Sequence, residues 1–354
     1  MARQKASAVN WDLFSKNRAL LMGFSIVLII VFHWAENFSL LLDYTPPLLY
    51  PLVKQGSTGV EMFLFLSGIG LYFSFTRNSN LKDFYVKRFV QILVPYLMIA
   101  APYQIWQDFF YTDHGISGFL ADLSMVTTFL PFNRQGWYVA LILILYLLFP
   151  LFYAIIKRFS TPGFAVLELL FLALPLAVQI YNEPLFNLIQ IALTRIPTFL
   201  LGVYCGRFVY EKKPLRVFPW LMAALYLFFT AANLYGKSLG LRTTVAVRYQ
   251  RASLALLILL VVALILQRFP LPRVKAFFTF AAPMTLELYL AHVQVRRMFP
   301  RLFKGSWTAS SVNLAYVSII AISVPVAYFV HEKSKPVIAS LLRRFSSAPP
   351  KETN

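Results

Sequence analysis

Ten long apolar runs follow one another along the sequence, and they constrain the fold more than any other feature. A bilayer core is about 30 Å thick, and a helix crosses it with about 20 apolar residues. The strands of a membrane β-barrel would be shorter and would alternate apolar with polar residues, unlike these continuous runs. The sequence therefore predicts about ten transmembrane helices, at residues 19–38, 59–75, 92–110, 138–156, 163–180, 189–209, 218–234, 254–266 (extended toward Val245), 277–293 and 315–330.

The composition agrees with a membrane fold. Only 13% of the 354 residues are charged, whereas a soluble domain carries about 25% charged residues. Without a sequence repeat or a long polar linker, we expect an all-α, polytopic membrane protein with a single domain over residues 1–345. The segment 346–354 is expected to be a disordered tail. The short apolar segment 117–132 is expected to lie along the membrane interface or to re-enter it.

Cysteine content and net charge limit the disulfides, metal sites and partners that we expect. Cys205 is the only cysteine, so no intrachain disulfide is possible, and no Cys/His cluster suggests a metal site. The formal net charge is +19. Basic residues of membrane proteins collect at the cytoplasmic ends of helices, which explains this charge without a nucleic-acid partner. We therefore expect neither a metal nor nucleic acid.

The distribution of basic residues predicts the orientation in the membrane. Two thirds of the 33 lysines and arginines fall in the set of alternate loops that includes both termini, which places both termini in the cytoplasm. Most of the remaining basic residues lie in two outer loops, 237–251 and 296–304. Either a span is miscounted in the C-terminal half, or these loops meet an anionic substrate or anionic lipid headgroups. The sequence leaves both explanations open.

Ionisable residues inside membrane spans are costly, and they mark candidate functional sites. His33 lies in the outer part of the first span, and Glu36 follows three residues later on the same helical face. A carboxylate there could fix the tautomer of the imidazole, which makes His33 a candidate general base for a hydroxyl group. Glu36 is equally consistent with an interfacial residue in contact with water, and a lone histidine such as His292 is as consistent with an interhelical hydrogen bond as with a functional role. The remaining candidates are Glu61, Arg195, Glu287 and His292.

Motifs of soluble enzymes do not appear in the sequence. We find no nucleophile elbow and no phosphate-binding glycine loop. Gly68 and Gly70 lie inside an apolar span and lack the third glycine of a nucleotide-binding fingerprint. We interpret them as a site of close helix packing.

Six stretches, in order along nearly the whole chain, resemble the acyltransferase-3 family of bacterial membrane proteins. They read LMGFSIVLIIVFH (21–33), GVEMFLFLSG (59–68), FYVKRFVQILVP (84–95), GWYV (136–139), RIPTFLLG (195–202) and LELYLAH (286–292). The resemblance implies a ten-helix enzyme in the cell (plasma or inner) membrane. It also implies transfer of an acyl group, usually acetyl from acetyl-CoA, to a hydroxyl group outside the cytoplasm. The acceptors implied are cell-surface sugars, polysaccharides or glycolipids.

The resemblance also assigns roles to single residues. His33 stands where the family has its essential histidine, and Glu332 resembles an acidic position near the end of the family domain. Lys87 and Arg88 are expected to hold the phosphates of acyl-CoA, as fixed cations do. We expect Glu36 to orient His33, and Arg195 to stabilise the oxyanion that forms on the thioester carbonyl.

The sequence departs from the family pattern at two places. The family commonly has an arginine three turns before the histidine, where Met22 stands here, with Arg18 one turn earlier. The second arginine of the Arg-x-x-Arg motif is replaced by Gln91. The alternative function is a transporter or flippase of a lipid-linked or anionic metabolite. Transporters often have paired, interrupted helices, and no such pair is evident in the sequence. A scaffold without chemistry fits the buried ionisable residues least well.

Overall fold

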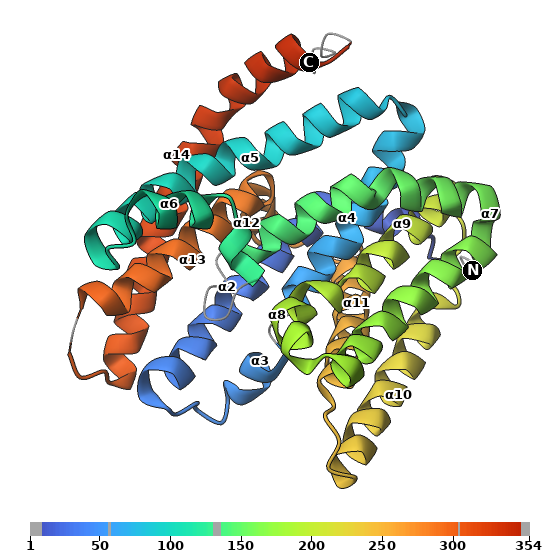
Figure 1. Ribbon diagram of the computed structural model, residues 1–354. Helices are drawn as coiled ribbons and strands as arrows, with labels where there is room; N and C mark the ends of the chain where they lie inside the picture. The colour runs from blue at the N-terminus through green and yellow to red at the C-terminus, as the bar shows by residue number, and fades with distance from the viewer. Residues whose placement is uncertain (1–8, 56–57, 130–135, 304, 348–354) are drawn as a thin grey trace.

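The computed structural model describes residues 9–55, 58–129, 136–303 and 305–347, without the side chains of 52–54 (Figure 1). Residues 130–132 of the predicted interfacial segment, residue 304 of the second basic loop and residues 348–354 of the predicted tail lie outside the described ranges. Within those ranges the chain is helical and forms no β-strand beyond one isolated bridge, between Asn10 and Pro214. The predicted all-α fold is confirmed.

Fourteen α-helices and three short π or 3-10 segments make up the described part of the chain. In chain order they are α1 (Asp12–Lys16), α2 (Arg18–Leu42), α3 (Tyr50–Gln55), α4 (Thr58–Arg77), α5 (Leu81–Ile105), the π-helix η1 (Trp106–Tyr111), α6 (Gly115–Leu123), η2 (Val126–Phe129), α7 (Trp137–Tyr181), α8 (Glu183–Leu193), α9 (Ile196–Tyr210), α10 (Phe218–Ser238), α11 (Thr244–Arg268), α12 (Pro272–Ala281), η3 (Ala282–Met284), α13 (Thr285–Leu302) and α14 (Ala309–Phe345).

Nine helical segments in the described ranges are long and apolar enough to cross a membrane. One of them, α7, accounts for two of the ten predicted spans. Its backbone breaks at Ser160, which has a φ of 53°, and Pro162 follows two residues later. Figure 1 shows α7 doubling back at this break. The short helix α6 and the turn η2 lie in the segment predicted to stay at the interface, and α6 is too short to span.

Two predicted spans are interrupted, and the prediction of continuous helices there was wrong. The span 189–209 is split at Thr194 and Arg195, between α8 and α9. The span 277–293 is split at η3, between α12 and α13. Pro197 and Pro283 explain both breaks, because proline has no N–H and its ring clashes with the carbonyl four residues earlier. The sequence argued against a transporter because no interrupted pair of helices was evident, and that argument therefore fails.

Helix α4 lies at the centre of the bundle. Its most apolar window is 83% buried, against 17% for α10 at the periphery. It crosses α9 closely because two glycines face each other there: a Cβ on Gly68 would lie 2.6 Å from the carbonyl oxygen of Phe199, and one on Gly202 would lie 2.3 Å from that of Phe65. The interpretation of this glycine segment as a packing site is confirmed.

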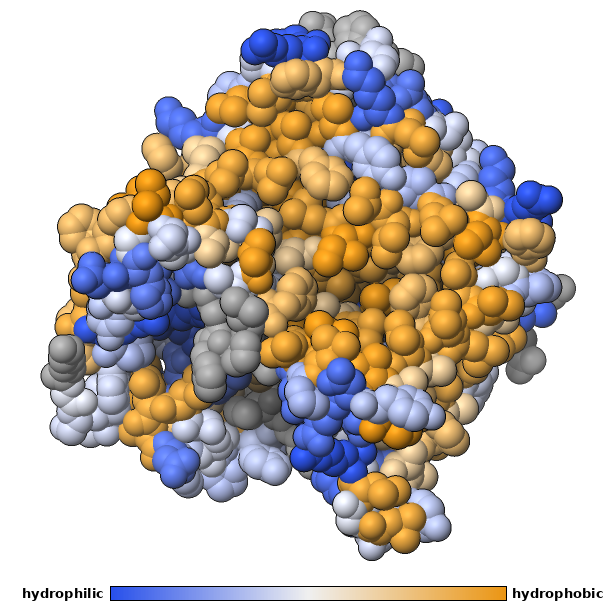
Figure 2. Space-filling model, in the orientation of Figure 1, coloured by the Kyte–Doolittle hydropathy of each residue, from blue (hydrophilic) through white to orange (hydrophobic). Residues whose placement is uncertain are grey.

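Apolar side chains cover much of the outside of the bundle. Figure 2 shows a nearly continuous hydrophobic surface across the middle of one face, with hydrophilic residues toward its edges. Such an area on a soluble protein would be a liability, but it suits the hydrocarbon core of a bilayer. Exposed apolar residues of the peripheral helices include Leu147, Leu151, Leu169, Leu170, Leu227, Phe228, Leu314 and Val317.

Helix α2 joins two groups of helices. It packs on α4, which belongs to the group with α9 and α11, and also on α12, α13 and α14. The hydroxyl of Tyr316 in α14 donates a hydrogen bond of 2.5 Å to the carbonyl oxygen of Ile30, which fixes α14 against the outer half of α2. The residues that follow Ile30 therefore lie where the two groups meet.

The helix turns also test the span count. The α10–α11 and α13–α14 turns, which carry the two basic loops, lie at the same end of the molecule as the α2–α3 turn in Figure 1. The α4–α5 turn and the C-terminal end of α14 lie toward the opposite end. With α7 counted as two arms, no span is missing from the C-terminal half of the described chain. The explanation by a miscounted span therefore loses its basis, and the alternative, that these loops meet an anionic substrate or anionic lipid headgroups, stays a prediction.

Candidate functional site: two cavities at a histidine pair

Two histidines from helices far apart in the sequence meet in the outer half of the bundle. His33 Nδ1 lies 2.7 Å from His292 Nε2. His292 is fully buried, and its Nδ1 lies 2.7 Å from the carbonyl oxygen of Leu288, four residues earlier in α13. The sequence identified both histidines as candidates but gave no sign that they are partners.

These contacts assign the tautomer of each ring. A carbonyl oxygen only accepts, so Nδ1 of His292 carries the proton, and Nε2 of the neutral ring is then an acceptor. His33 Nδ1 must donate to it. The lone pair of the neutral His33 ring is therefore on Nε2, where it is available to remove a proton from a hydroxyl group.

Glu36 lies beside a different residue from the one expected. Its carboxylate accepts a hydrogen bond of 2.7 Å from Arg296, whose Nε donates to the side chain of Asn37 at 2.6 Å. The ion pair ties the outer end of α2 to α13. In the structure His292, rather than Glu36, occupies the position that orients His33.

An outer cavity of about 130 Å³ opens at His33. Trp137 and Tyr289 form part of its apolar wall, and Arg297 and Gln294 contribute polar groups. Gly136, which precedes Trp137, has a φ of 69°, a conformation that glycine adopts without strain. This left-handed turn begins α7 and places the tryptophan ring in the cavity wall.

An inner cavity of about 160 Å³ lies closer to the predicted cytoplasmic side. Arg18 and Arg88 line it together with Met22 and Gln91, the two positions that depart from the family pattern. Arg18 enters from one turn before Met22, so two arginines still face this space. The buried Nε of Arg88 has no hydrogen-bond partner among the described residues.

An aromatic pair separates the cavities. Tyr138 lines the inner cavity and Tyr289 lines the outer one, and their ring centroids are 5.1 Å apart. Tyr289 also meets His292 edge-on at 5.9 Å. Because Trp137 and Tyr138 are consecutive, the start of α7 contributes one aromatic residue to each cavity.

Arg195 lies behind the outer cavity and does not line it. Its Nε is 3.1 Å from the buried carboxylate of Glu61, and its Nη1 donates a 2.5 Å hydrogen bond to the carbonyl oxygen of Ile191. The guanidinium lies over the ring of Trp137, 4.8 Å from its centroid. Arg195 is thus arranged to hold the tryptophan in place and does not itself contact the outer cavity.

Two other predicted site residues do not line either cavity. Glu332 is exposed on α14 and pairs with Lys335 at 2.6 Å. Lys87 is exposed and does not line the inner cavity beside Arg88. A buried pair that the sequence did not suggest, Glu287 with His331 at 3.1 Å, links α13 to α14.

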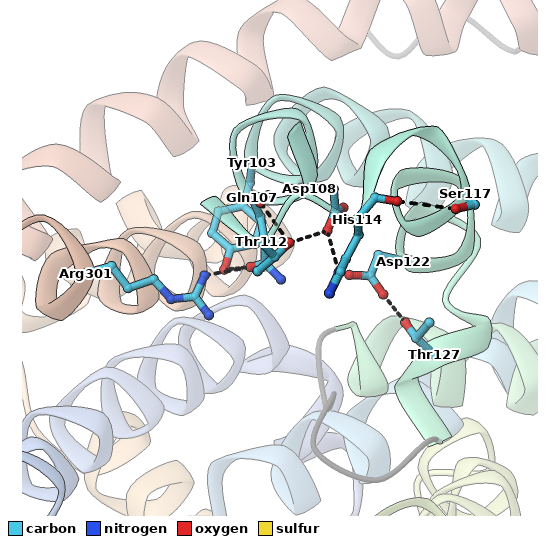
Figure 3. Close-up of polar contacts among 9 residues, drawn as sticks. All are labelled: Tyr103, Gln107, Asp108, Thr112, His114, Ser117, Asp122, Thr127 and Arg301. Atoms are coloured by element: carbon cyan, nitrogen blue, oxygen red, sulfur yellow. Dashed lines mark hydrogen bonds and ion pairs between the residues drawn. The ribbon is translucent and has the colours of Figure 1, made fainter. Parts of the chain in front are cut away.

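A polar layer covers the outer ends of α5, η1 and α6, as Figure 3 shows. Arg301 donates a 2.9 Å hydrogen bond to Gln107 Oε1, which also accepts one of 2.6 Å from Tyr103. The same guanidinium packs over the ring of Tyr111 at 4.6 Å. In this layer Asp108 lies 3.6 Å from His114. Arg301 is therefore held by residues of η1, and it does not line the cavity at His33.

Comparison with known proteins gives one result. A family model for an acyltransferase domain, Acyl_transf_3, matches residues 20–332. The comparisons with curated proteins and with solved structures found no match. The matched range runs from the first turn of α2 to the inner half of α14, and it contains every residue that lines the two cavities except Arg18.

Proposed function

The chain belongs to the Acyl_transf_3 family of acyltransferases, and on that premise we propose that it transfers an acetyl group from acetyl-CoA to a hydroxyl group of a cell-surface sugar, polysaccharide or glycolipid. The premise itself makes the chain a multi-pass membrane acyltransferase. The donor, the acceptor and a location in a bacterial plasma (inner) membrane are the proposal. The observation that carries it is the His33–His292 hydrogen bond at the wall of the outer cavity.

We assign the inner cavity to acyl-CoA. Arg18 and Arg88 supply two cations for its phosphates on the predicted cytoplasmic side. The thioester would then extend past Tyr138 and Tyr289 to reach His33. The two substrates would approach the histidine from opposite sides of the membrane.

The chemistry requires one base. Nε2 of His33 removes the proton from the acceptor hydroxyl as its oxygen attacks the carbonyl carbon of the thioester. The carbon–sulfur bond breaks and the acetyl ester forms. The sulfur of CoA takes up the proton that His33 holds and leaves as the thiol. His292 accepts the hydrogen bond from Nδ1 throughout and so keeps the reactive nitrogen directed at the cavity. General base catalysis of this kind is worth about 10²–10⁴ in rate.

Two of the three remaining predicted catalytic residues take supporting roles. Arg195 acts through Trp137, and Glu36 acts through Arg296. Both are positioning residues in this mechanism. Glu332, exposed and paired with Lys335, has no part in it.

The test is thioester consumption by the purified protein in detergent or liposomes. Release of the CoA thiol that depends on a sugar acceptor, with one ester formed for each thiol, is the expected result. A protein that binds neither acetyl-CoA nor a longer acyl-CoA, and releases no thiol, would refute the donor assignment. In cells, loss of the gene should remove ester-linked acetyl groups from surface glycans.

A further inference from the structure

The outer cavity contains an arginine whose charge is not neutralised. Arg296 and Arg297 are neighbours in α13, and both line the cavity at His33. Arg296 is paired with Glu36 at 2.7 Å. None of the ion pairs among the described residues includes Arg297. Its hydrogen-bonding contact is with the hydroxyl of Tyr103, which is uncharged.

A second polar side chain of the cavity has an atom that no described residue satisfies. Gln294 is 7% exposed, and its Oε1 is buried with no hydrogen-bond partner among the described residues. A buried amide oxygen left unpaired is costly. A hydroxyl group that entered the cavity would satisfy it. Gln294 therefore indicates a ligand that donates hydrogen bonds, as a sugar does.

Taken together, the cavity presents three different groups to its ligand. His33 offers a lone pair for the reacting hydroxyl, Gln294 an acceptor for a second hydroxyl, and Arg297 a cation. The cation is partly enclosed, and a charge in such surroundings interacts more strongly than one in water. A neutral acceptor would leave it uncompensated.

We propose that the outer cavity takes an anionic sugar unit, whose carboxylate or phosphate binds Arg297 while a hydroxyl of the same unit meets His33. This inference rests on the proposed function and adds the charge of the acceptor to it. It also gives a reason why basic residues lie at the outer end of α13, a question that the sequence left open. Arg297 is the residue that selects the acceptor.

The test compares three small acceptors with the same ring hydroxyls: methyl glucuronide, methyl glucoside 6-phosphate and neutral methyl glucoside. Acetyl-CoA consumption by the full-length protein in detergent gives kcat/KM for each. We expect at least one anionic acceptor to exceed the neutral one by about tenfold or more, the range of a hydrogen bond to a charged group. Whichever anionic acceptor is preferred shows whether the cavity binds a carboxylate or a phosphate.

Variants of α13 test whether Arg297 causes the preference for an anionic acceptor. Arg297→Gln should reduce the ratio of anionic to neutral kcat/KM by about 10- to 100-fold, mainly through KM, because it removes a charged hydrogen bond. Arg297→Lys should restore part of the ratio. Arg301→Gln is the matched control: it removes one charge from the same helix, but its side chain contacts Gln107 and lies outside the cavity. Its ratio should equal that of the wild type.

The outcomes separate the inference from the function on which it rests. Thiol release that is equal for neutral and anionic acceptors, or absent with both anionic ones, overturns the charged acceptor and leaves the transferase intact. Equal loss of selectivity in Arg297→Gln and Arg301→Gln overturns the assignment to Arg297, because it indicates a general effect of surface charge. Absence of thiol release under every condition counts against the proposed function itself. Thermal unfolding of each variant shows whether the protein is folded.

Discussion

Replacing His292 with alanine should slow the reaction by removing the hydrogen-bond acceptor of His33. The two ring nitrogens are 2.7 Å apart, and His292 is fully buried, so water does not readily replace it. When His33 takes the proton of the acceptor, it becomes a cation and its bond to His292 becomes charge-assisted. A hydrogen bond to a charged group contributes about 1.5–3 kcal/mol. At 1.36 kcal/mol for each factor of ten, kcat should fall by about 10- to 100-fold.

The assay is release of the CoA thiol, followed with a chromogenic disulfide reagent over a range of acceptor and acetyl-CoA concentrations. The KM values should change little, because His292 contacts neither substrate in the proposed mechanism. His292→Gln should recover part of kcat, since its amide oxygen can accept the hydrogen bond from His33 Nδ1. If His292 had only a structural role, His292→Gln would not have a higher kcat than an equally stable His292→Ala. Folded His292→Ala protein with kcat within about twofold of the wild type would refute the reasoning.

Three further predictions concern the base, the donor site and the fold. His33→Ala should insert and fold normally but lose about 10²–10⁴-fold in turnover, and activity near wild type in a stable preparation would exclude the mechanism. Arg88→Ala should raise the Kd for acetyl-CoA, measured by titration, whereas an unchanged Kd would remove this residue from the donor site. Gly202→Leu should lower thermal stability, by roughly 1–3 kcal/mol, because even its Cβ would lie 2.3 Å from a backbone oxygen of α4. Gly305→Ala meets nothing within 4 Å and should be neutral; equal stability of these two variants would contradict the packing account.

The transmembrane spans were the part of the fold that could be predicted from sequence. Every predicted span lies in a helical segment of the structure, because an apolar run of that length has few alternatives in a bilayer. The break between the fourth and fifth spans was also predictable, since Ser160 and Pro162 lie within a short stretch of lower hydrophobicity. The interruptions at Arg195 and at η3 were missed, although a proline accompanies each. Proline is tolerated inside other helices of this chain, such as α5, so its presence alone did not mark a break.

The candidate site was predicted only in part. His33 stood out because a histidine in an apolar helix is costly, and family resemblance supported it. His292 was a candidate as well, but its contact with His33 could not be predicted, because the two residues are 259 positions apart and the contact depends on how α2 and α13 pack. The spacing of Glu36 on the same helical face suggested the wrong neighbour for this reason. Local periodicity shows which residues share a face, but tertiary packing decided that the carboxylate meets Arg296.

The two cavities also bear on how such an enzyme can diversify. Within the described residues, none of those that line the inner cavity also lines the outer one. Substitutions near the end of α13 can therefore redesign one recognition surface while leaving the other intact. The pair Trp137 and Tyr138 is the exception, because a change in this turn moves a side chain on each side at once. A chimera that exchanges residues 293–297 between homologues should carry the preference for one substrate with it, and the turn before α7 should be left unaltered in such grafts.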